Sequence, residues 1–564
     1  MIVAISKRRA WLRASARHLT LAAALVASFT AFADGDSAYF FPGNLVVSRS
    51  VYDNNPNTIQ VGQMLPPNCD TTMAAAGSCV TAAYDGTYPT VFNNAPIDAS
   101  FGITSKIFLD QITTSGALLT SLEVPNSSQN GVPPTKDQMV TSFSSKSEIA
   151  LNLSTDHSYL TFMGYVSPID AIDVSNANTA GAVDPSNPVG ENVFRAVAQV
   201  DAKGQFKFTE TNAYSGNNGR AAILNNTAGA NVFYTSGNAG NGGNPQPDGI
   251  IIGAGAQIIN PETKALVAQN PGSPTPVGSF SITQLGDAAD KVGKDTNFRG
   301  LTIFNNVIYT TKGSGGNGIN TVYFIDTTGQ SCPSTSATPG IGIPESFATL
   351  PTAGIPFDPA LLQTQGVTPY NMCVLSGFNT KLAKKTTNSF PFGVWFANST
   401  TLYVSDEGNG DNTFVPGPGG ALGTYTVAAG QTKAGLQKWV FNSTTQQWNL
   451  AYTLQAGLAL GAPYTIAGYP TGTNPATGLP WTPATDGLRN ITGNVNGDGT
   501  ATIYAITSTV SGNGDQGADP NKLVAITDTL ATGGPTAPAG ESFTTVRAAG
   551  NLEVLRGVSF TPGS

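Results

Sequence analysis

The chain has 564 residues, with 27 Lys and Arg against 35 Asp and Glu, which gives a net charge of −8. Only 11% of the residues are charged, and 64 are glycine. This composition is typical of an all-β exported protein, and the acidic balance argues against nucleic acid or an anionic membrane surface as partner, because both require clustered Lys and Arg.

The first 33 residues have the pattern of a secretory signal peptide. An apolar run at 19–32 is too short for a membrane span, which takes roughly 20 apolar residues. It ends on Ala31-Phe32-Ala33, an A-x-A cleavage site. We therefore predict a signal peptide at 1–33, one mature domain at 34–564, a secreted or periplasmic location and no membrane span. Cleavage leaves 22 basic against 35 acidic residues, a net charge of −13. The basic residues that precede the apolar run are Lys7, Arg8, Arg9, Arg13 and Arg17.

Four cysteines, an even number, predict disulfides in an oxidising compartment. Cys69 and Cys79 are ten residues apart and are expected to close a local loop, which leaves Cys332 and Cys373 for a second bridge. Four cysteines allow three pairings, so the other two stay open.

A hairpin motif recurs along the chain. In "FRGLTIFNNVIYTTKGSGGNG" (298–318), a short strand, an Asn-Asn turn and a second strand are followed by a Gly/Asn-rich loop. Such turns between β-branched or aromatic runs are a strong hairpin signal. A second strand pair follows the hairpins, so each unit has the four antiparallel strands of a propeller blade. The hairpins lie at 147–166, 219–243, 298–318, 392–410 and 488–514, and strand pairs or their openings at 105–124, 193–214, 321–326, 436–454 and 522–549.

The two ends of the chain complement each other. The first strands begin near 147, 220, 300, 393, 490 and 557, and the last of them, "GVSF" (557–560), has no second strand. "NLVVSRS" (44–50) has the pattern of a second strand without a first. Pairing them completes a blade and removes an open edge. We therefore predict a six-bladed β-propeller with long loops, closed by its N- and C-terminal strands; a seven-bladed ring and a pair of β-sandwiches are the alternatives.

Residues just before each first strand, and the loops after each second strand, are expected to share one face around the central channel. Basic residues repeat there, and they predict either an anion or polyol pocket with Arg as the clamp or a structural role in which each Arg ties one blade to the next. The candidates are Arg49, Arg220, Arg299, Lys312, Arg489 and Arg556. Trp481, in the long loop 469–490, is expected either to stack on a sugar ring or to pack the loop.

Metal chemistry depends on carboxylates. His157 is the only histidine after residue 33 and lies in a hairpin turn, which argues against a Ser-His-Asp triad or a His-ligated metal. Glu148 and Asp406 are the candidate ligands for calcium, in company with Asp/Asn-rich loops. Ordinary turn chemistry is the alternative explanation of those loops.

The blade motifs resemble a known group of proteins. "FRGLTIFNNVIYTTKGSGGNGINTVY" (298–323) and "FPFGVWFANSTTLYVSDEG" (390–408) are similar to secreted bacterial and fungal propellers of uncharacterised function, and more distantly to the six-bladed TolB-like set with its NHL-repeat and gluconolactonase-like members. The lactonase-like members use Glu, Asn and Asp around a divalent metal; in this chain Glu148 and Asp406 fall at plausible places, and the Asn has no match. The resemblance covers most of residues 40–564. Its motifs are blade motifs, which imply the fold and no particular activity.

Two functions follow as expectations. The first is a monomeric binding or scaffolding propeller for a small polar ligand, a glycan or another protein. The second is a calcium-assisted hydrolase or lactonase that acts on a small polar or sugar-like substrate.

Overall fold

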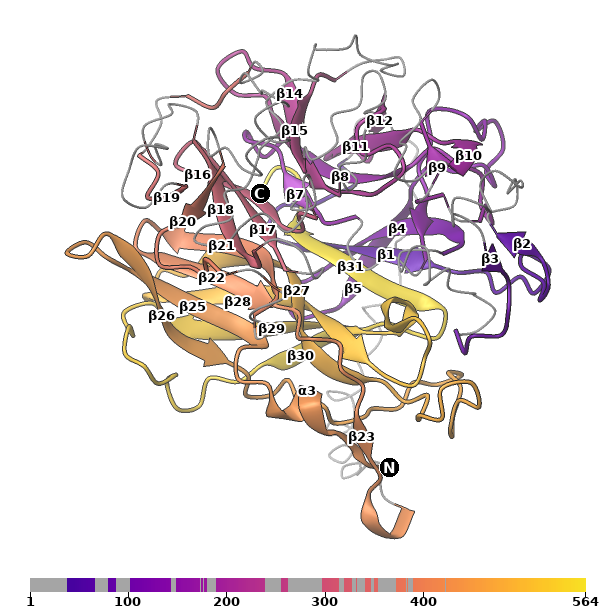
Figure 1. Cartoon of the computed structure of the whole chain (residues 1–564). Helices are drawn as coiled ribbons and strands as arrows, with labels where there is room; N and C mark the ends of the chain where they lie inside the picture. The colour runs from indigo at the N-terminus through magenta and orange to yellow at the C-terminus, as the bar shows by residue number, and fades with distance from the viewer. Residues whose placement is uncertain are drawn as a thin grey trace, which may run out of the picture.

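A computed structural model shows an all-β six-bladed propeller, in which six antiparallel sheets are arranged around a central axis (Figure 1). Within the described residues the α-helix is a single turn, α3 (Thr426–Gly430), and no helix there is long and apolar enough to cross a membrane. The predicted signal peptide, 1–33, lies outside the described residues. The structure describes 38–65, 80–87, 102–143, 149–172, 174–175, 177–179, 189–238, 255–261, 297–313, 319–326, 331, 340–345, 349–352, 372–381, 383, 389–420 and 422–564.

Each blade is one sheet whose first strand is nearest the axis, and we number the blades 1 to 6. Blade 1 contains β31 (Glu553–Phe560), β1 (Leu45–Val51), β4 (Thr104–Ile112) and β5 (Leu118–Glu123). Blade 2 contains β7 (Asn152–Leu153), β8 (Tyr159–Tyr165), β11 (Arg195–Asp201) and β12 (Phe206–Thr211); blade 3 contains β13 (Gly219–Asn225), β14 (Val232–Gly237) and β15 (Ala256–Ile259). Blade 4 contains β16 (Leu301–Phe304), β17 (Val307–Lys312), β18 (Thr321–Ile325), β20 (Met372–Leu375) and β19 (Ile341–Gly342). Blade 5 contains β21 (Pro391–Asn398), β22 (Thr401–Asp406), β25 (Gly435–Asn442) and β26 (Gln447–Leu454); blade 6 contains β27 (Ala484–Val495), β28 (Thr500–Val510), β29 (Lys522–Thr529) and β30 (Thr544–Ala548).

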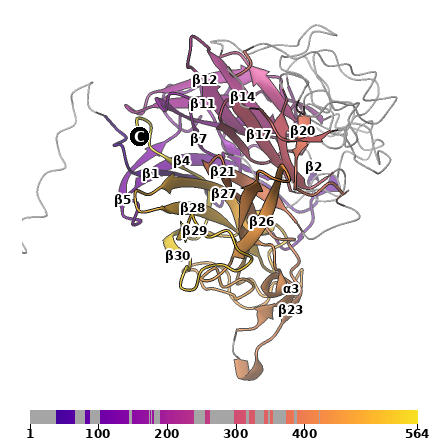
Figure 2. The ribbon, with the colours of Figure 1, turned by 90° about the vertical axis from the view of Figure 1, so that its left-hand side faces the viewer.

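Short strands lie outside this pattern. β23 (Phe414–Val415) and β24 (Thr424–Tyr425) form a hairpin beside α3 that projects from the body of the propeller (Figure 2). The others are β2 (Met64–Leu65) with β3 (Val80–Thr81), β9 (Ala177–Asn178) with β10 (Val189–Asn192), and β6 (Thr141–Ser142), which pairs with β4.

The predicted closure of the ring is confirmed. β1 pairs antiparallel with β31, with Val47 opposite Val558, and pairs with β4 on its other side. The first strands then contact one another in a complete circle, β31 to β7, β13, β16, β21, β27 and back to β31. The C-terminal strand therefore has β1 beside it in the sheet and inner strands on both sides in the ring.

The hairpin turns explain the local fold. Asn305 and Asn306 both have positive φ, 49° and 58°, as a tight two-residue turn between β16 and β17 requires. The hydrophobic core lies between neighbouring blades, as where Phe304 of blade 4 stacks on Phe396 of blade 5 with ring centroids 4.6 Å apart. Alternating side chains of each strand thus bury against the next blade.

A repeated glycine lets consecutive inner strands approach. Gly300 donates its N–H to the Thr311 hydroxyl (2.8 Å), and this hydroxyl donates to the Phe392 carbonyl of the next blade. A Cβ at Gly300 would lie 2.2 Å from that carbonyl oxygen, so no larger residue fits. The arrangement recurs at Gly393 with Ser405 and the Arg489 carbonyl, and at Gly557 with Ser48 and the Ile149 carbonyl.

One cysteine can be placed. Cys373 is fully buried in β20 and takes part in a disulfide. Cys69, Cys79 and Cys332 lie outside the described residues, so the predicted pairings stay predictions.

Candidate functional site

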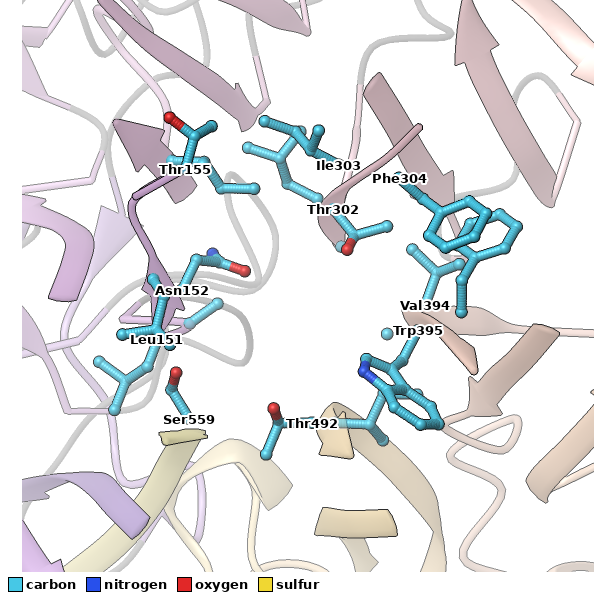
Figure 3. Close-up of a pocket in the computed structure, with 18 of the residues that line it drawn as sticks. Leu151, Asn152, Thr155, Thr302, Ile303, Phe304, Val394, Trp395, Thr492 and Ser559 are labelled. Carbon is cyan, nitrogen blue, oxygen red and sulfur yellow. The ribbon is translucent and has the colours of Figure 1, made fainter. Parts of the chain in front are cut away.

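A cavity of about 720 Å³ lies on the propeller axis and is lined by the inner strands of all six blades (Figure 3). The residue two positions after the repeated glycine, or after its equivalent, lines the cavity in every blade. We call these six residues the axial ring. They are Asn152, Ile223, Thr302, Trp395, Thr492 and Ser559.

The cavity extends toward the turns that join the first and second strands. Thr155, Thr227 and Asn305, which stand in or beside these turns in blades 2, 3 and 4, are part of its lining. Sequence reasoning placed the site at the other end of the inner strands, where the repeated arginines stand. The described cavity thus lies toward the opposite face of the ring.

Four of the six residues of the axial ring are polar and uncharged. In Figure 3, Asn152, Thr302, Thr492 and Ser559 surround the open space. The hydroxyls of the last three have no hydrogen-bond partner among the described residues. The described lining contains no Asp, Glu, Lys or Arg; its ionisable residue is His157, whose Nδ1 lies 3.0 Å from the Ser564 carbonyl oxygen. The cavity therefore offers donors and acceptors without a net charge.

One wall of the cavity is aromatic. Trp395 stands there with Phe304 and Phe396, and it lies 5.9 Å, between ring centroids, from Tyr403. The indole packs across Gly493 of blade 6, where a Cβ would come within 2.9 Å of it. Glycine at this position thus fixes where the indole can lie.

The repeated arginines lie between the blades. Arg220, Arg299, Arg489 and Arg556 are at most 6% exposed, and none lines the axial cavity. Arg220 donates to the Phe298 carbonyl (3.1 Å) ahead of the next blade. Arg556 donates to the carbonyls of Ser142 (3.4 Å) and Phe143, which precede blade 2.

Two of the arginines meet on one aromatic ring. Arg299 of blade 4 and Arg489 of blade 6 both lie over Phe392 of blade 5, 5.6 Å and 6.0 Å from its centroid. Arg489 also donates to the Glu407 carboxylate at 3.1 Å. Each arginine is thus in contact with a neighbouring blade, which matches the structural alternative in geometry; their role in ligand binding stays a prediction.

The remaining basic candidates are also engaged. Arg49 forms a bidentate pair with Asp110 (2.7 and 3.2 Å) and a further ion pair with Glu553 (2.7 Å). The Lys312 ammonium is buried and donates to Asn320 Oδ1 (3.1 Å).

Trp481 lies away from the axial cavity. It is buried and packs in a small apolar cluster with Tyr469. The tryptophan that lines the axial cavity is Trp395.

The carboxylate candidates give no metal site among the described residues. Glu148 lies outside them, and no group of three His, Cys, Asp or Glu side chains within them is placed to hold an ion. Asp406 is fully buried and accepts from the N–H groups of Phe390 (2.7 Å) and Gly408 (3.1 Å) and from Gln437 (3.2 Å). Burial raises its pKa to about 7. Asp406 thus accepts three protein hydrogen bonds, and its role as a calcium ligand stays a prediction.

A pH-dependent stability follows from another buried carboxyl. Burial raises the pKa of Asp519 to about 7, although Tyr469 (2.7 Å) and Asn513 (3.1 Å) donate to it. In the unfolded chain the pKa is near 3.9, so between about pH 4 and 7 the folded state holds a proton that the unfolded state lacks. This stabilisation is complete below about pH 4 and is lost as the pH rises to about 7, at up to roughly 1.4 kcal/mol per pH unit.

We expect Asp519→Asn to flatten the pH profile accordingly. The measurement is the free energy of unfolding at pH 5, 6, 7 and 8, in which the wild-type value should fall with pH more steeply than the variant value. Asp137→Asn, at a carboxylate that is 68% exposed, is the control. Parallel profiles for the wild type and Asp519→Asn would show that the carboxyl does not titrate in this range.

The axial ring was missed at the sequence level, although a signal was present. Aligning the inner strands on the repeated glycine puts Thr302, Trp395 and Ser559 in one column, "GLTIF", "GVWF" and "GVSF". Side chains of one face recur every second residue in a strand, so this column shares a face. The residue types alone do not indicate that this face points toward the propeller axis.

Comparisons with known proteins give no family. No family model matches the chain, and no curated protein matches it. Among solved structures, a PL25 ulvan lyase, described as a new family of polysaccharide lyase and solved bound to -[GlcA(1-4)Rha3S]-, is similar over 84% of this chain and 94% of its own, at 10% identity and a TM-score of 0.28. A second structure described as a PL25 ulvan lyase is similar over the same shares, at 9% identity and a TM-score of 0.25.

Proposed function

We propose that this protein is a binding propeller whose ligand is an uncharged, polyhydroxylated molecule, such as a short neutral glycan, held in the axial cavity. The observation that carries the proposal is the axial ring, in which three unpaired hydroxyls and an amide stand beside a tryptophan. Hydroxyl groups of a sugar exchange hydrogen bonds with Ser, Thr and Asn, while its apolar C–H face packs on an aromatic ring.

The absence of charge among the described lining residues limits the ligand class. An ionised ligand loses hydration when it enters a cavity and needs a paired charge to offset the loss. The axial cavity offers no such partner among those residues. Its volume, about 720 Å³, lies within the range of small-molecule sites.

The test is direct titration with neutral oligosaccharides, followed by calorimetry and by tryptophan fluorescence. Thr302→Val and Ser559→Ala each remove one hydroxyl, and each should cost roughly 0.5–1.5 kcal/mol of binding free energy. Trp395→Ala should abolish binding, while Trp439→Phe, outside this cavity, should not change it. Binding that survives Trp395→Ala would reject the axial cavity as the site.

The alternative, a calcium-assisted hydrolase or lactonase, has less support. It depends on Glu148 and on Asp406, whose oxygens already accept protein hydrogen bonds. We further propose that the protein is a distant relative of the TolB-like propellers, that it is a monomer and that it is exported from the cytoplasm. The blade motifs support the first of these, and the pattern of residues 1–33 supports the last.

A further inference from the structure

A second pocket, which we call the side pocket, lies between blades 4 and 5. Its volume is about 380 Å³, and it shares no lining residue with the axial cavity. It is formed by the start of β18, the segment after β20 and the facing strands β25 and β26. The residues that matter are Phe378, Asn379, Lys381, Lys433 and Trp439.

The aromatic wall of the side pocket is held in place. Phe378 stacks on Trp439 with ring centroids 3.9 Å apart. The Trp439 Nε1–H donates to Gln437 Oε1 (3.1 Å), and Gln437 Nε2 donates in turn to the Lys433 carbonyl (3.0 Å). The indole and the backbone that carries Lys433 are therefore linked by hydrogen bonds.

The loop that carries Lys381 is also fixed. Asn379 Nδ2 donates to the carbonyls of Asn320 and Lys381, both at 3.1 Å, and Asn379 Oδ1 accepts from the Lys381 N–H (3.2 Å). This ties the loop to the start of β18. The position of Lys381 is thus set by the fold, although its side chain is exposed.

The charge of the side pocket differs from that of the rest of the protein. Lys381 and Lys433 both line it, no Asp or Glu does so among the described residues, and neither lysine has an ion-pair partner there. Several cations elsewhere among the described residues are paired with acids, as Lys438 is with Asp528 and Arg489 with Glu407. Two unpaired ammonium groups beside an aromatic wall make a site that favours an anion with an apolar face.

We propose that the side pocket binds an acidic sugar, a hexuronate unit, with its carboxylate between Lys381 and Lys433 and its ring against Trp439. The two lysines supply the countercharge, and the indole packs on the C–H face of the ring. A simple oxyanion such as phosphate meets the lysines but leaves the aromatic wall unused. A neutral hexose meets the wall but leaves the lysines unused.

The experiment titrates the full-length Trp395→Ala variant, which lacks the proposed axial binding site, with D-galacturonate, D-galactose and inorganic phosphate at low ionic strength. Galacturonate should bind at least tenfold more tightly than either of the others, and its affinity should fall as salt is raised. Lys381→Gln and Lys433→Gln should each weaken it about tenfold or more, while Lys207→Gln, at an exposed lysine of blade 2, should have no effect.

Tryptophan fluorescence separates the two pockets, because each is lined by one tryptophan. Galacturonate should change the emission of Trp395→Phe as it does that of the wild type, and it should not do so in Trp439→Phe. Equal binding of galactose, equal binding of phosphate, or unchanged affinity in both lysine variants would each overturn the proposal. None of these results bears on the neutral ligand of the axial cavity, whose test uses Trp395→Ala.

Discussion

Deletion of residues 555–564 is expected to open the ring and convert the protein into an aggregating species. The deletion removes most of β31, which supplies the partner of β1 in the sheet and the link between β27 and β7 in the circle of inner strands. It also removes the buried side chains of Leu555 and Val558. β1 is left with an unpaired edge, which is a template for pairing with other chains. Size-exclusion chromatography with light scattering measures the outcome directly.

A point variant tests the same closure without shortening the chain. Gly557→Val places a Cβ about 2.5 Å from the Ile149 carbonyl, where backbone atoms of blade 2 leave no room. We expect a loss of several kcal/mol in stability, as overpacking typically costs 1–3 kcal/mol and the Ser48 bridge between blades is disturbed as well. Gly497→Ala, in a hairpin turn with no atom within 4 Å of the new Cβ, is the matched control. A truncated chain that stays monomeric and unfolds cooperatively would refute closure by β31.

The blades were predictable because their signals are local. Asn305-Asn306 and "NGDG" (496–499) specify turns, and alternating residues on both sides specify strands. Ring closure was predictable because both chain ends carried half of one motif. The strand β20 was not predicted, since it lies 46 residues beyond β18 and pairs with it only through tertiary packing.

The site was less predictable, because its properties arise between blades. Arg299 and Arg489 stand out in the sequence as charges at repeated positions, yet they lie buried over Phe392. Thr302 and Ser559 look like ordinary strand residues and line the axial cavity. Polarity in a sequence indicates where hydrogen bonds are needed, while only the packing of six blades decides which polar groups keep access to a ligand.

A buried ion pair joins blades 5 and 6. The side chains of Lys438 on β25 and Asp528 on β29 are both fully buried, with Nζ 2.8 Å from Oδ2. Lys438 also donates to the Thr529 carbonyl (2.6 Å) and contacts the Tyr452 hydroxyl (3.0 Å). Tyr452 (2.7 Å) and Tyr403 donate to the Asp528 carboxylate. Burial, together with the nearby Asp528 carboxylate, raises the pKa of both tyrosines, so they remain donors.

Removing one partner of this pair should be far more costly than removing both. Asp528→Asn leaves a buried ammonium without its countercharge, and we expect the free energy of unfolding to fall by about 3–5 kcal/mol. Lys438→Met should cost a similar amount, because it leaves the carboxylate buried and unpaired. The double variant Lys438→Met/Asp528→Leu removes both charges and should recover most of the loss. Denaturant unfolding of the four proteins gives the coupling energy as a double-mutant cycle.

The partly exposed pair of Lys106 and Glu123 (3.2 Å) provides the control, and Lys106→Met should cost less than about 1 kcal/mol. If the double variant loses as much as the sum of the single variants, the cost comes from packing and the buried charges are not coupled. If it recovers, the four groups act as one electrostatic unit that holds blade 5 to blade 6. The same two blades are also joined at their inner strands, where the Ser405 hydroxyl donates to the Arg489 carbonyl.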